Sequence, residues 1–201
     1  MVQDAPAWLR TSSSREVGGP AASSGPSVLF VCTGNICRSA FAEVYMRHVL
    51  GPNSSICVKS AGIMALAGQP LDATLEVQAR HHGVSDTHHV ARQLTGRMLN
   101  DATVIFIFGP EHYQWISRNY PDHVAKVVGL GQSVEILKRL PSGYAPSLKA
   151  LPAVVRHHVL ARNSALWIPD PYKRGADAAS EAATRIRGDI DTIASSLALP
   201  N

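Results

Sequence analysis

Apolar and polar positions along this chain follow two periods, one typical of strands and one typical of helices. Four short apolar runs predict strands, at residues 27–32, 55–59, 102–108 and 125–130. The first run is nearly continuous, which is typical of a strand buried on both faces. Helical patterns follow at residues 39–50, 71–82 and around 113–120, and a last apolar stripe runs from Ala179 to Leu197. Strands that alternate with helices predict a three-layer α/β/α fold, with a four-stranded parallel sheet between helices.

Two segments fall outside this alternation. Residues 1–26 are rich in Ser, Gly, Pro and Ala, a composition that buries little apolar surface, so we expect a disordered tail. Residues 131–168 hold extra material, and we expect one or two helices there, broken at Pro141, Gly143, Pro146 and Pro152. The predicted organisation is a tail followed by one domain over residues 27–198, with a helical insert at 131–168.

Composition is that of an ordinary globular domain. The 201 residues are 45% hydrophobic, with a mean hydropathy of zero and a net charge of +4. This mild basic excess suits an anionic substrate, while no arginine-rich arm or zinc-finger spacing indicates nucleic acid. No run approaches a membrane span, the N-terminus lacks the apolar core of a signal peptide, and three cysteines fit free thiols in a reducing compartment. We therefore expect a cytoplasmic protein without membrane insertion.

The loop after the first predicted strand holds the candidate chemistry. Five residues separate Cys32 from Arg38, and Ser39 is the expected N-cap of the next helix. The strand end places the Cys32 sulfur at the carboxyl edge of the sheet, where α/β folds bind ligands. Backbone N–H groups of a tight loop, the helix N-terminus and the planar Arg38 guanidinium can hold an oxyanion, and they favour the thiolate form of Cys32. A nucleophile in an anion cradle predicts covalent phosphoryl transfer.

Three further residues of this loop have expected roles. Gly34 allows a close backbone approach or a positive φ angle. Asn35 tolerates a left-handed conformation and can tie the loop together through its amide. The Ser39 hydroxyl can donate to the sulfur and ease its departure. The spacing of cysteine and arginine alone arises easily by chance, so the prediction depends on the strand–loop–helix context.

Residues 31–39 resemble the phosphate loop of the low-molecular-weight protein tyrosine phosphatases, which reads Cys-x-Gly-Asn-x-Cys-Arg-Ser. Other stretches follow in that family's order: Glu43, Ser-Ala-Gly at 60–62, residues 89–94, and Asp-Pro-Tyr at 170–172. The resemblance covers most of residues 27–198, except the stretch 131–168. It implies a cofactor-free phosphomonoesterase that acts on phosphotyrosine in proteins or on aryl phosphates, with a cognate tyrosine kinase as a candidate partner. It leaves the oligomeric state unknown.

The resemblance also implies a role for each matching residue. Cys32 would be the nucleophile, Arg38 the ligand of the phosphate and the transition state, and Asp170 the general acid that later activates water. The other phosphate-binding positions would be Thr33, Gly34, Asn35, Ile36, Cys37 and Ser39. Ser60 and His89, together with Asn35, would support the loop, and Tyr172 would form one wall for the substrate ring. Taken alone, Asp170 fits a turn and His89 fits a surface histidine beside His88.

The remaining cysteines leave different possibilities open. Cys37 lies close enough in sequence to Cys32 for either a packed thiol or a reversible disulfide, and the resemblance suggests the disulfide. Cys57 lies on a predicted strand and is expected in the core.

Several positions depart from the family's pattern. Ala40 replaces a proline after the loop serine, which reduces rigidity in the first helical turn. Gly109 stands where many members carry an aspartate, which predicts a missing hydrogen bond. The loop 63–66 has no aromatic residue, so the substrate ring is expected to meet only Tyr172. In the insert, Arg-His-His at 156–158 is expected on a solvated helix face rather than in a metal site.

Two other functions compete with the phosphatase. A thiol-dependent arsenate reductase shares this fold but needs further cysteines to relay a disulfide, and Cys57 is predicted on a strand far from such a relay. A non-catalytic oxyanion-binding module would be expected to lack Cys32, Arg38 or Asp170, and all three are present.

Overall fold

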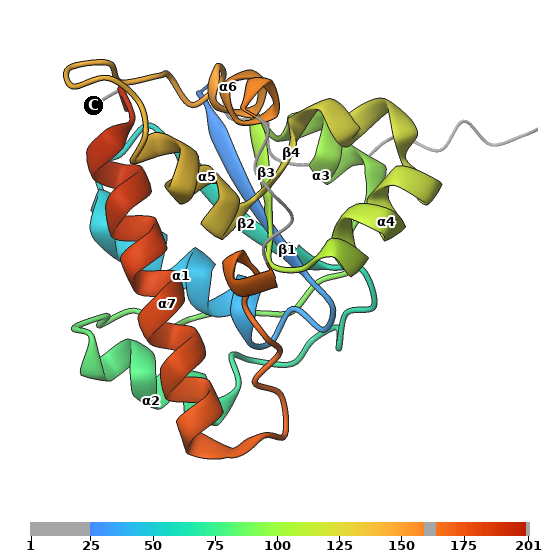
Figure 1. Cartoon of the computed structure of the whole chain (residues 1–201). Helices are drawn as coiled ribbons and strands as arrows, with labels where there is room; N and C mark the ends of the chain where they lie inside the picture. Colours follow the sequence, from blue (N-terminus) through green and yellow to red (C-terminus); the bar gives the residue numbers. More distant parts are fainter. Residues whose placement is uncertain (1–24, 159–163, 200–201) are drawn as a thin grey trace, which may run out of the picture.

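The computed structural model describes residues 25–158 and 164–199. These residues contain one parallel sheet in the order β2-β1-β3-β4, which confirms the predicted four-stranded parallel sheet (Figure 1). Its strands are β1 (Ser27–Cys32), β2 (Cys57–Gly62), β3 (Val104–Ile107) and β4 (Val127–Gly129). Cys32, the last residue of β1, pairs in register with Gly62, the last residue of β2. The candidate nucleophile therefore lies at the carboxyl edge of the sheet, next to its centre.

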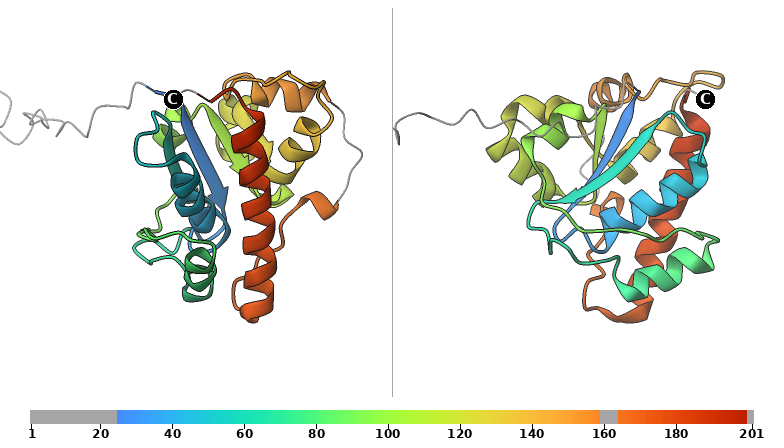
Figure 2. Two further views of the ribbon diagram at one scale, coloured as in Figure 1. Left: turned by 90° about the vertical axis from the view of Figure 1, so that its left-hand side faces the viewer. Right: turned by 180° about the vertical axis from the view of Figure 1, so that it is seen from behind.

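Helices cover both faces of the sheet, as the three-layer prediction requires (Figure 1). One face carries α1 (Arg38–Leu50), α2 (Ala73–His81), α5 (Leu130–Leu137) and α7 (Gly175–Ser196). The helix α7 packs against the other three (Figure 2). The opposite face carries α3 (Gly96–Asp101), α4 (Pro110–Asn119) and the 3-10 helix η2 (Pro121–Lys126). Helix α6 (Leu151–His157) lies against β4, the edge strand.

The side chains of β1 belong alternately to two apolar clusters, one on each face of the sheet. Val28 and Phe30 belong to the larger apolar cluster under α1 and α7, whereas Leu29 and Val31 belong to the smaller one under α3 and α4. Burial of each such side chain stabilises the fold by about 1.5–3 kcal/mol. The predicted stripe of the last helix is buried along its whole length, at Ala179, Ala183, Ile186, Ile190, Ile193 and Leu197.

Some predicted boundaries are wrong. The strand expected at residues 55–59 begins at Cys57 and continues through Gly62, because Ser60 to Gly62 pair with the last three residues of β1. Helix α1 begins at Arg38 with Cys37 in the cap position, so Ser39 is not the N-cap. Pro152 does not break a helix but lies in the first turn of α6, where its missing N–H is tolerated. Cys57 is only half-buried rather than in the core.

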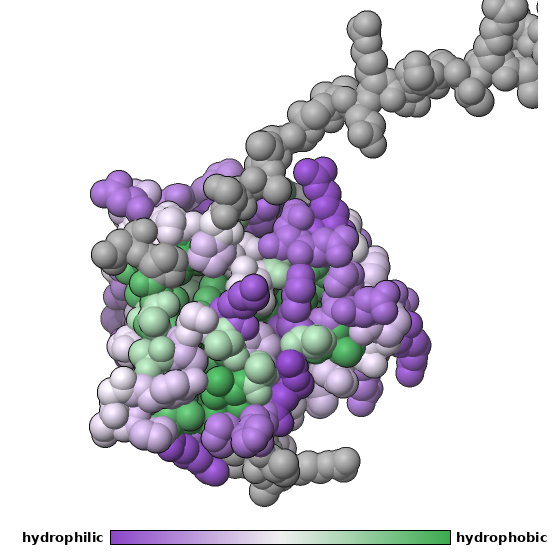
Figure 3. All heavy atoms as spheres, turned by 90° about the horizontal axis from the view of Figure 1, so that it is seen from above, coloured by the Kyte–Doolittle hydropathy of each residue, from purple (hydrophilic) through white to green (hydrophobic). Residues whose placement is uncertain are grey.

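The two unusual segments are only partly described. The tail expected at residues 1–26 falls almost entirely outside the described residues. The insert contains α5, α6 and the short 3-10 helix η3 (Ser164–Leu166), with residues 159–163 undescribed. Arg156, His157 and His158 are exposed, as expected. Figure 3 faces the end of the molecule opposite the carboxyl edge of the sheet, and apolar and polar residues are interspersed there. In the described part of the chain, no helix has both the length and the apolar character to cross a membrane.

Candidate active site

The loop between β1 and α1 wraps around the sulfur of Cys32. The Asn35 N–H donates to Cys32 Sγ at 3.3 Å, and Ser39 Oγ lies 2.9 Å from the same atom. Asn35 holds a φ angle of 56°, the left-handed conformation that this residue type tolerates better than most. Cys32 is almost fully buried, at 2% exposure. One backbone N–H and one hydroxyl group therefore lie within hydrogen-bonding distance of a sulfur at the end of a central strand.

The Asn35 side chain fixes this loop from inside. Its amide nitrogen donates to Ser39 Oγ at 2.9 Å and to Ser60 Oγ at 2.7 Å, and its amide oxygen accepts the Arg92 N–H at 2.8 Å. His89 Nε2 lies 2.7 Å from the Asn35 carbonyl oxygen. Asn35, Ser60 and His89 therefore form one connected network, and His89 is buried whereas His88 is not.

A buried carboxylate, Glu43, lies at the centre of this network. Its Oε2 accepts from Ser60 Oγ at 2.5 Å and from His89 Nδ1 at 3.1 Å, and its Oε1 lies 3.1 Å from an Arg92 guanidinium nitrogen. Burial alone would raise the pKa of Glu43, but the hydrogen bonds from His89 and Ser60 and the Arg92 charge lower it below its ordinary value. Glu43 is therefore charged, and its contacts with Ser60, His89 and Arg92 hold together the network that supports the loop.

Close packing against the loop explains why the Ser-Ala-Gly motif at 60–62 ends in glycine. A Cβ atom at this position would lie 2.5 Å from the Thr33 carbonyl oxygen, closer than packed atoms come. The strand β2 therefore passes directly under the phosphate loop only because residue 62 has no side chain.

The next residue of the site is Arg38, in the first turn of α1, whose guanidinium contacts the segment before α7. Its Nη1 donates to the Ile168 carbonyl oxygen at 3.1 Å, and its Nη2 lies 2.7 Å from Asp170 Oδ2. Its Nε is buried and has no partner among the described residues. Arginine binds phosphate best with two parallel N–H groups, so the edge formed by Nε and Nη2 is suited to that task.

The loop before α7 brings Asp170 and Tyr172 to this site from the C-terminal part of the chain. Asp170 is about half exposed, and its Oδ1 accepts the Tyr172 N–H at 3.3 Å. Tyr172 is 40% exposed, which leaves its ring open to solvent. Leu66, also partly exposed, lies beside Gly34 in the loop. An apolar side chain of the loop 63–66 therefore lies next to the phosphate loop.

The two loop cysteines differ in chemical character. Burial raises the pKa of the Cys37 thiol well above its ordinary value, and the charges of Asp72 and Asp170 raise it further. Cys37 is therefore held as a neutral thiol, which is a poor nucleophile. Both Cys32 and Cys37 are free thiols, and the Asn35 N–H and the Ser39 hydroxyl contact the sulfur of Cys32.

His112 and Glu111 reach the site from the first turn of α4. The Gly109 N–H donates to His112 Nδ1 at 3.1 Å, so the hydrogen of the neutral ring lies on Nε2. That nitrogen is 3.3 Å from Thr33 Oγ1 and 3.3 Å from Glu111 Oε1. Burial, together with the Arg38 charge, lowers the pKa of His112 to about 3, so the ring stays neutral.

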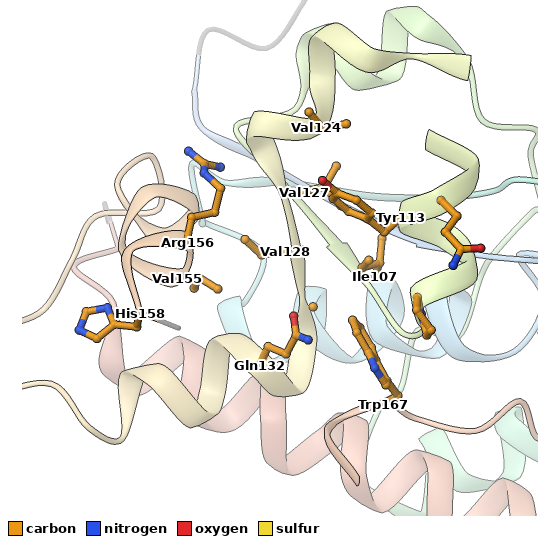
Figure 4. Close-up of a pocket in the computed structure, with 13 residues that line it drawn as sticks. Ile107, Tyr113, Val124, Val127, Val128, Gln132, Val155, Arg156, His158 and Trp167 are labelled. Atoms are coloured by element: carbon orange, nitrogen blue, oxygen red, sulfur yellow. The ribbon is translucent and has the colours of Figure 1, made fainter. Parts of the chain in front are cut away.

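A separate cavity of about 440 Å³ lies beside β4 (Figure 4). Tyr113 and Trp167 flank it, whereas no residue of the phosphate loop lines it. It is therefore not the place where a substrate meets Cys32.

The structure brings the phosphate loop together with Ser60 and His89, and it pairs Arg38 with Asp170. It also adds other residues to the site. Glu43, Arg92, Glu111 and His112 were not predicted to contact it. Glu43 and Arg92, the latter within residues 89–94, were noted only as part of the family's pattern, and nothing in the sequence pointed to Glu111 and His112. Among the described residues, no group of three or more His, Cys, Asp and Glu side chains could hold a metal ion.

Comparison with known proteins identifies the family and supports the fold. The family model described as low molecular weight phosphotyrosine protein phosphatase matches residues 27–141. The low-molecular-weight protein-tyrosine-phosphatase Etp of Escherichia coli K12 is 37% identical over 141 residues, which are 70% of this chain and 91% of Etp. The crystal structure of the tyrosine phosphatase AmsI of Erwinia amylovora superposes with a TM-score of 0.66 at 28% identity, over 87% of this chain and 94% of AmsI.

The fold is also found in a phosphatase with a different substrate. The arginine phosphatase YwlE of Geobacillus stearothermophilus superposes with a TM-score of 0.64 at 24% identity, over 85% of this chain and 91% of YwlE. At this identity the likeness shows the fold alone.

Proposed function

The chain belongs to the low-molecular-weight phosphotyrosine protein phosphatase family, and we propose that it hydrolyses phosphotyrosine in proteins through a phosphorylated Cys32. The observation that carries this proposal is the convergence of three segments of the chain on one site. The end of β1 supplies Cys32, the start of α1 supplies Arg38, and the loop before α7 supplies Asp170, whose Oδ2 is 2.7 Å from Arg38 Nη2.

In the first step, Cys32 Sγ attacks phosphorus, and the bond from phosphorus to the phenolic oxygen breaks as Asp170 gives that oxygen a proton. Arg38 and the loop N–H groups hold the phosphate oxygens as charge develops on them. In the second step, water attacks phosphorus, Asp170 takes a proton from the water, and the S–P bond breaks. Ser39, 2.9 Å from the sulfur, stabilises the thiolate that leaves.

The pairing of Asp170 with Arg38 belongs to the enzyme without substrate. A phosphate dianion competes with the Asp170 carboxylate for Arg38 Nη2, because both are oxygen anions and the phosphate carries more charge. Substrate binding then releases Asp170 toward the leaving oxygen. The partly exposed side chains of Tyr172 and Leu66 provide apolar surface for the substrate ring.

The register of the sheet argues against the arsenate reductase. Cys57 pairs with Ser27 at the start of β1, whereas Cys32 ends the same strand. At about 3.3 Å per residue, Cys57 therefore lies roughly 16 Å from the nucleophile. A thiol at this distance cannot receive a disulfide from the loop.

The proposal has three further parts. The three free cysteines favour a cytoplasmic location. A tyrosine kinase that phosphorylates the same substrate is the natural partner of a phosphotyrosine phosphatase. We assign residues 27–198 to a single phosphatase domain that includes the insert.

The test compares hydrolysis of p-nitrophenyl phosphate, a phosphotyrosine peptide and a phosphoarginine peptide by wild type, Cys32→Ser and Asp170→Asn, with vanadate as inhibitor. The proposal predicts that wild type hydrolyses the first two, that C32S is inactive and that D170N is slowed most on the phosphotyrosine peptide. Preference for phosphoarginine would contradict the substrate. Arsenate-dependent thiol oxidation without phosphate release would establish the reductase.

A further inference from the structure

The first turn of α4 brings a carboxylate near the phosphate-binding arginine, at a different nitrogen from the one that Asp170 contacts. Glu111 Oε1 lies 3.7 Å from Arg38 Nη1, the nitrogen that also donates to the Ile168 carbonyl oxygen. Asp170 instead pairs with Nη2, and Nε has no partner among the described residues. Glu111 and the Ile168 carbonyl group thus contact the Nη1 end of the guanidinium. Neither of them contacts Nε or Nη2, the two nitrogens that form the edge suited to phosphate.

Gly109 makes this position of Glu111 available. A Cβ atom at residue 109 would lie 2.3 Å from both carboxylate oxygens of Glu111 and 2.5 Å from its Cδ. The backbone at Gly109 is extended, with φ −155° and ψ 160°, so the absent side chain does not reflect a need for an unusual conformation. The carboxylate of Glu111 occupies the space that a side chain at residue 109 would fill.

A neutral histidine orients the same carboxylate. Because the Gly109 N–H donates to His112 Nδ1, His112 Nε2 carries the hydrogen that faces Glu111 Oε1 at 3.3 Å. His112 is fully buried and Glu111 is about half exposed, so the donor is the fixed partner. The same nitrogen lies 3.3 Å from Thr33 Oγ1, which connects this turn to the phosphate loop.

We propose that Glu111 is a positioning residue, which holds the Nη1 end of the Arg38 guanidinium so that the Nε–Nη2 edge faces the transferred phosphoryl group. This inference deepens the proposed function and rests on it. Two effects of the carboxylate oppose each other. A negative charge near the site weakens binding of any anion, whereas a correctly oriented arginine favours the transition state over the ground state. A variant without the charge separates the two effects.

The first experiment measures kcat, inhibition by inorganic phosphate and inhibition by vanadate, whose five-coordinate form resembles the transition state, in wild type and Glu111→Gln. Positioning predicts that kcat falls roughly tenfold and that the affinity for vanadate relative to that for phosphate falls by a similar factor. A carboxylate that acts only as a charge predicts tighter binding of both anions in E111Q, with the same ratio and an unchanged kcat, and that result overturns the proposal. The inhibition ratio is informative even if wild type hydrolyses no ester, an outcome that would contradict the proposed function alone.

The second experiment moves the carboxylate. An aspartate at residue 109 places its carboxylate where that of Glu111 now lies, so Gly109→Asp combined with Glu111→Ala should recover kcat to within about threefold of wild type. The matched control is Gly109→Asn with Glu111→Ala, since asparagine caps α4 as well as aspartate but carries no charge. Rescue by aspartate alone supports the proposal. Equal rescue by both, or rescue by neither, overturns it.

Because an acidic residue in a first turn also stabilises its helix, the Tm of each variant is measured alongside. A loss of Tm that is equal in both double variants cannot explain a difference in their kcat.

Discussion

Replacing Asn35 with alanine should destabilise the domain and inactivate the site together. The buried side chain makes three hydrogen bonds, to Ser39, Ser60 and the Arg92 N–H, and each is worth about 0.5–1.5 kcal/mol net. Alanine also holds the φ angle of 56° less readily than asparagine, at a cost of about 1 kcal/mol. We expect Asn35→Ala to lower the free energy of unfolding by about 4 kcal/mol.

The matched control is Asn35→Gly, which removes the same hydrogen bonds but adopts the left-handed conformation without steric cost. N35G should therefore be about 0.5–1 kcal/mol more stable than N35A. Urea unfolding gives both stabilities, and kcat/KM for p-nitrophenyl phosphate should fall by more than about tenfold in both variants, because Ser39 and the loop lose their anchor. An active N35A within about 1 kcal/mol of wild type, or an N35G less stable than N35A, would refute the reasoning.

Three other predictions concern Glu43, Asp189 and Arg38. The pKa of Glu43 is lowered from 4.5, so its contribution to stability is complete above about pH 5 and is lost as the pH falls through its folded pKa. Urea unfolding should therefore show that the stability advantage of wild type over Glu43→Gln shrinks from about pH 5 to about pH 3. A constant advantage would contradict this. Burial raises the pKa of Asp189 from 3.8 to about 6, against the charges of Arg185 and Lys138, so the folded state binds this proton more tightly. Asp189→Asn should match wild type below about pH 4 and exceed its stability at pH 7 by up to about 3 kcal/mol, whereas equal stability at pH 7 would show that the buried charge costs nothing. Arg38→Lys keeps the charge but loses the planar fork, so kcat should fall at least about a hundredfold while the fold persists by circular dichroism; a near-normal kcat would mean that two-point binding is unimportant.

The predictions that succeeded depend on neighbours in sequence. The apolar run that ends at Cys32 and the loop that follows it are local features, so β1, the phosphate loop and α1 could be placed from the sequence. The stripe from Ala179 to Leu197 predicted the buried face of α7 because one helix carries the whole pattern. Asp170 came from a matching motif, and only the fold brings it to Arg38.

The failures concern residues whose role depends on distant partners. Ser60 to Gly62 look like a turn, but pairing with β1 overrides their weak strand propensity. Ser39 is a good N-cap in isolation, yet its hydroxyl is occupied by Cys32 and Asn35. Glu111 was not predicted near Arg38, because sequence spacing does not tell which side chain fills the space above a glycine.

Trapping of the phosphoenzyme tests the central claim most directly. Asp170→Ala should still transfer phosphate from p-nitrophenyl phosphate to the enzyme, because p-nitrophenolate leaves without a proton, but water attack on the intermediate should be slow. After a rapid quench, mass spectrometry of the digested protein should find close to one phosphate per chain, on Cys32, and none in Cys32→Ala combined with Asp170→Ala. Phosphate on another residue, or turnover by wild type with no phosphate on Cys32 in the Asp170→Ala variant, would contradict the account.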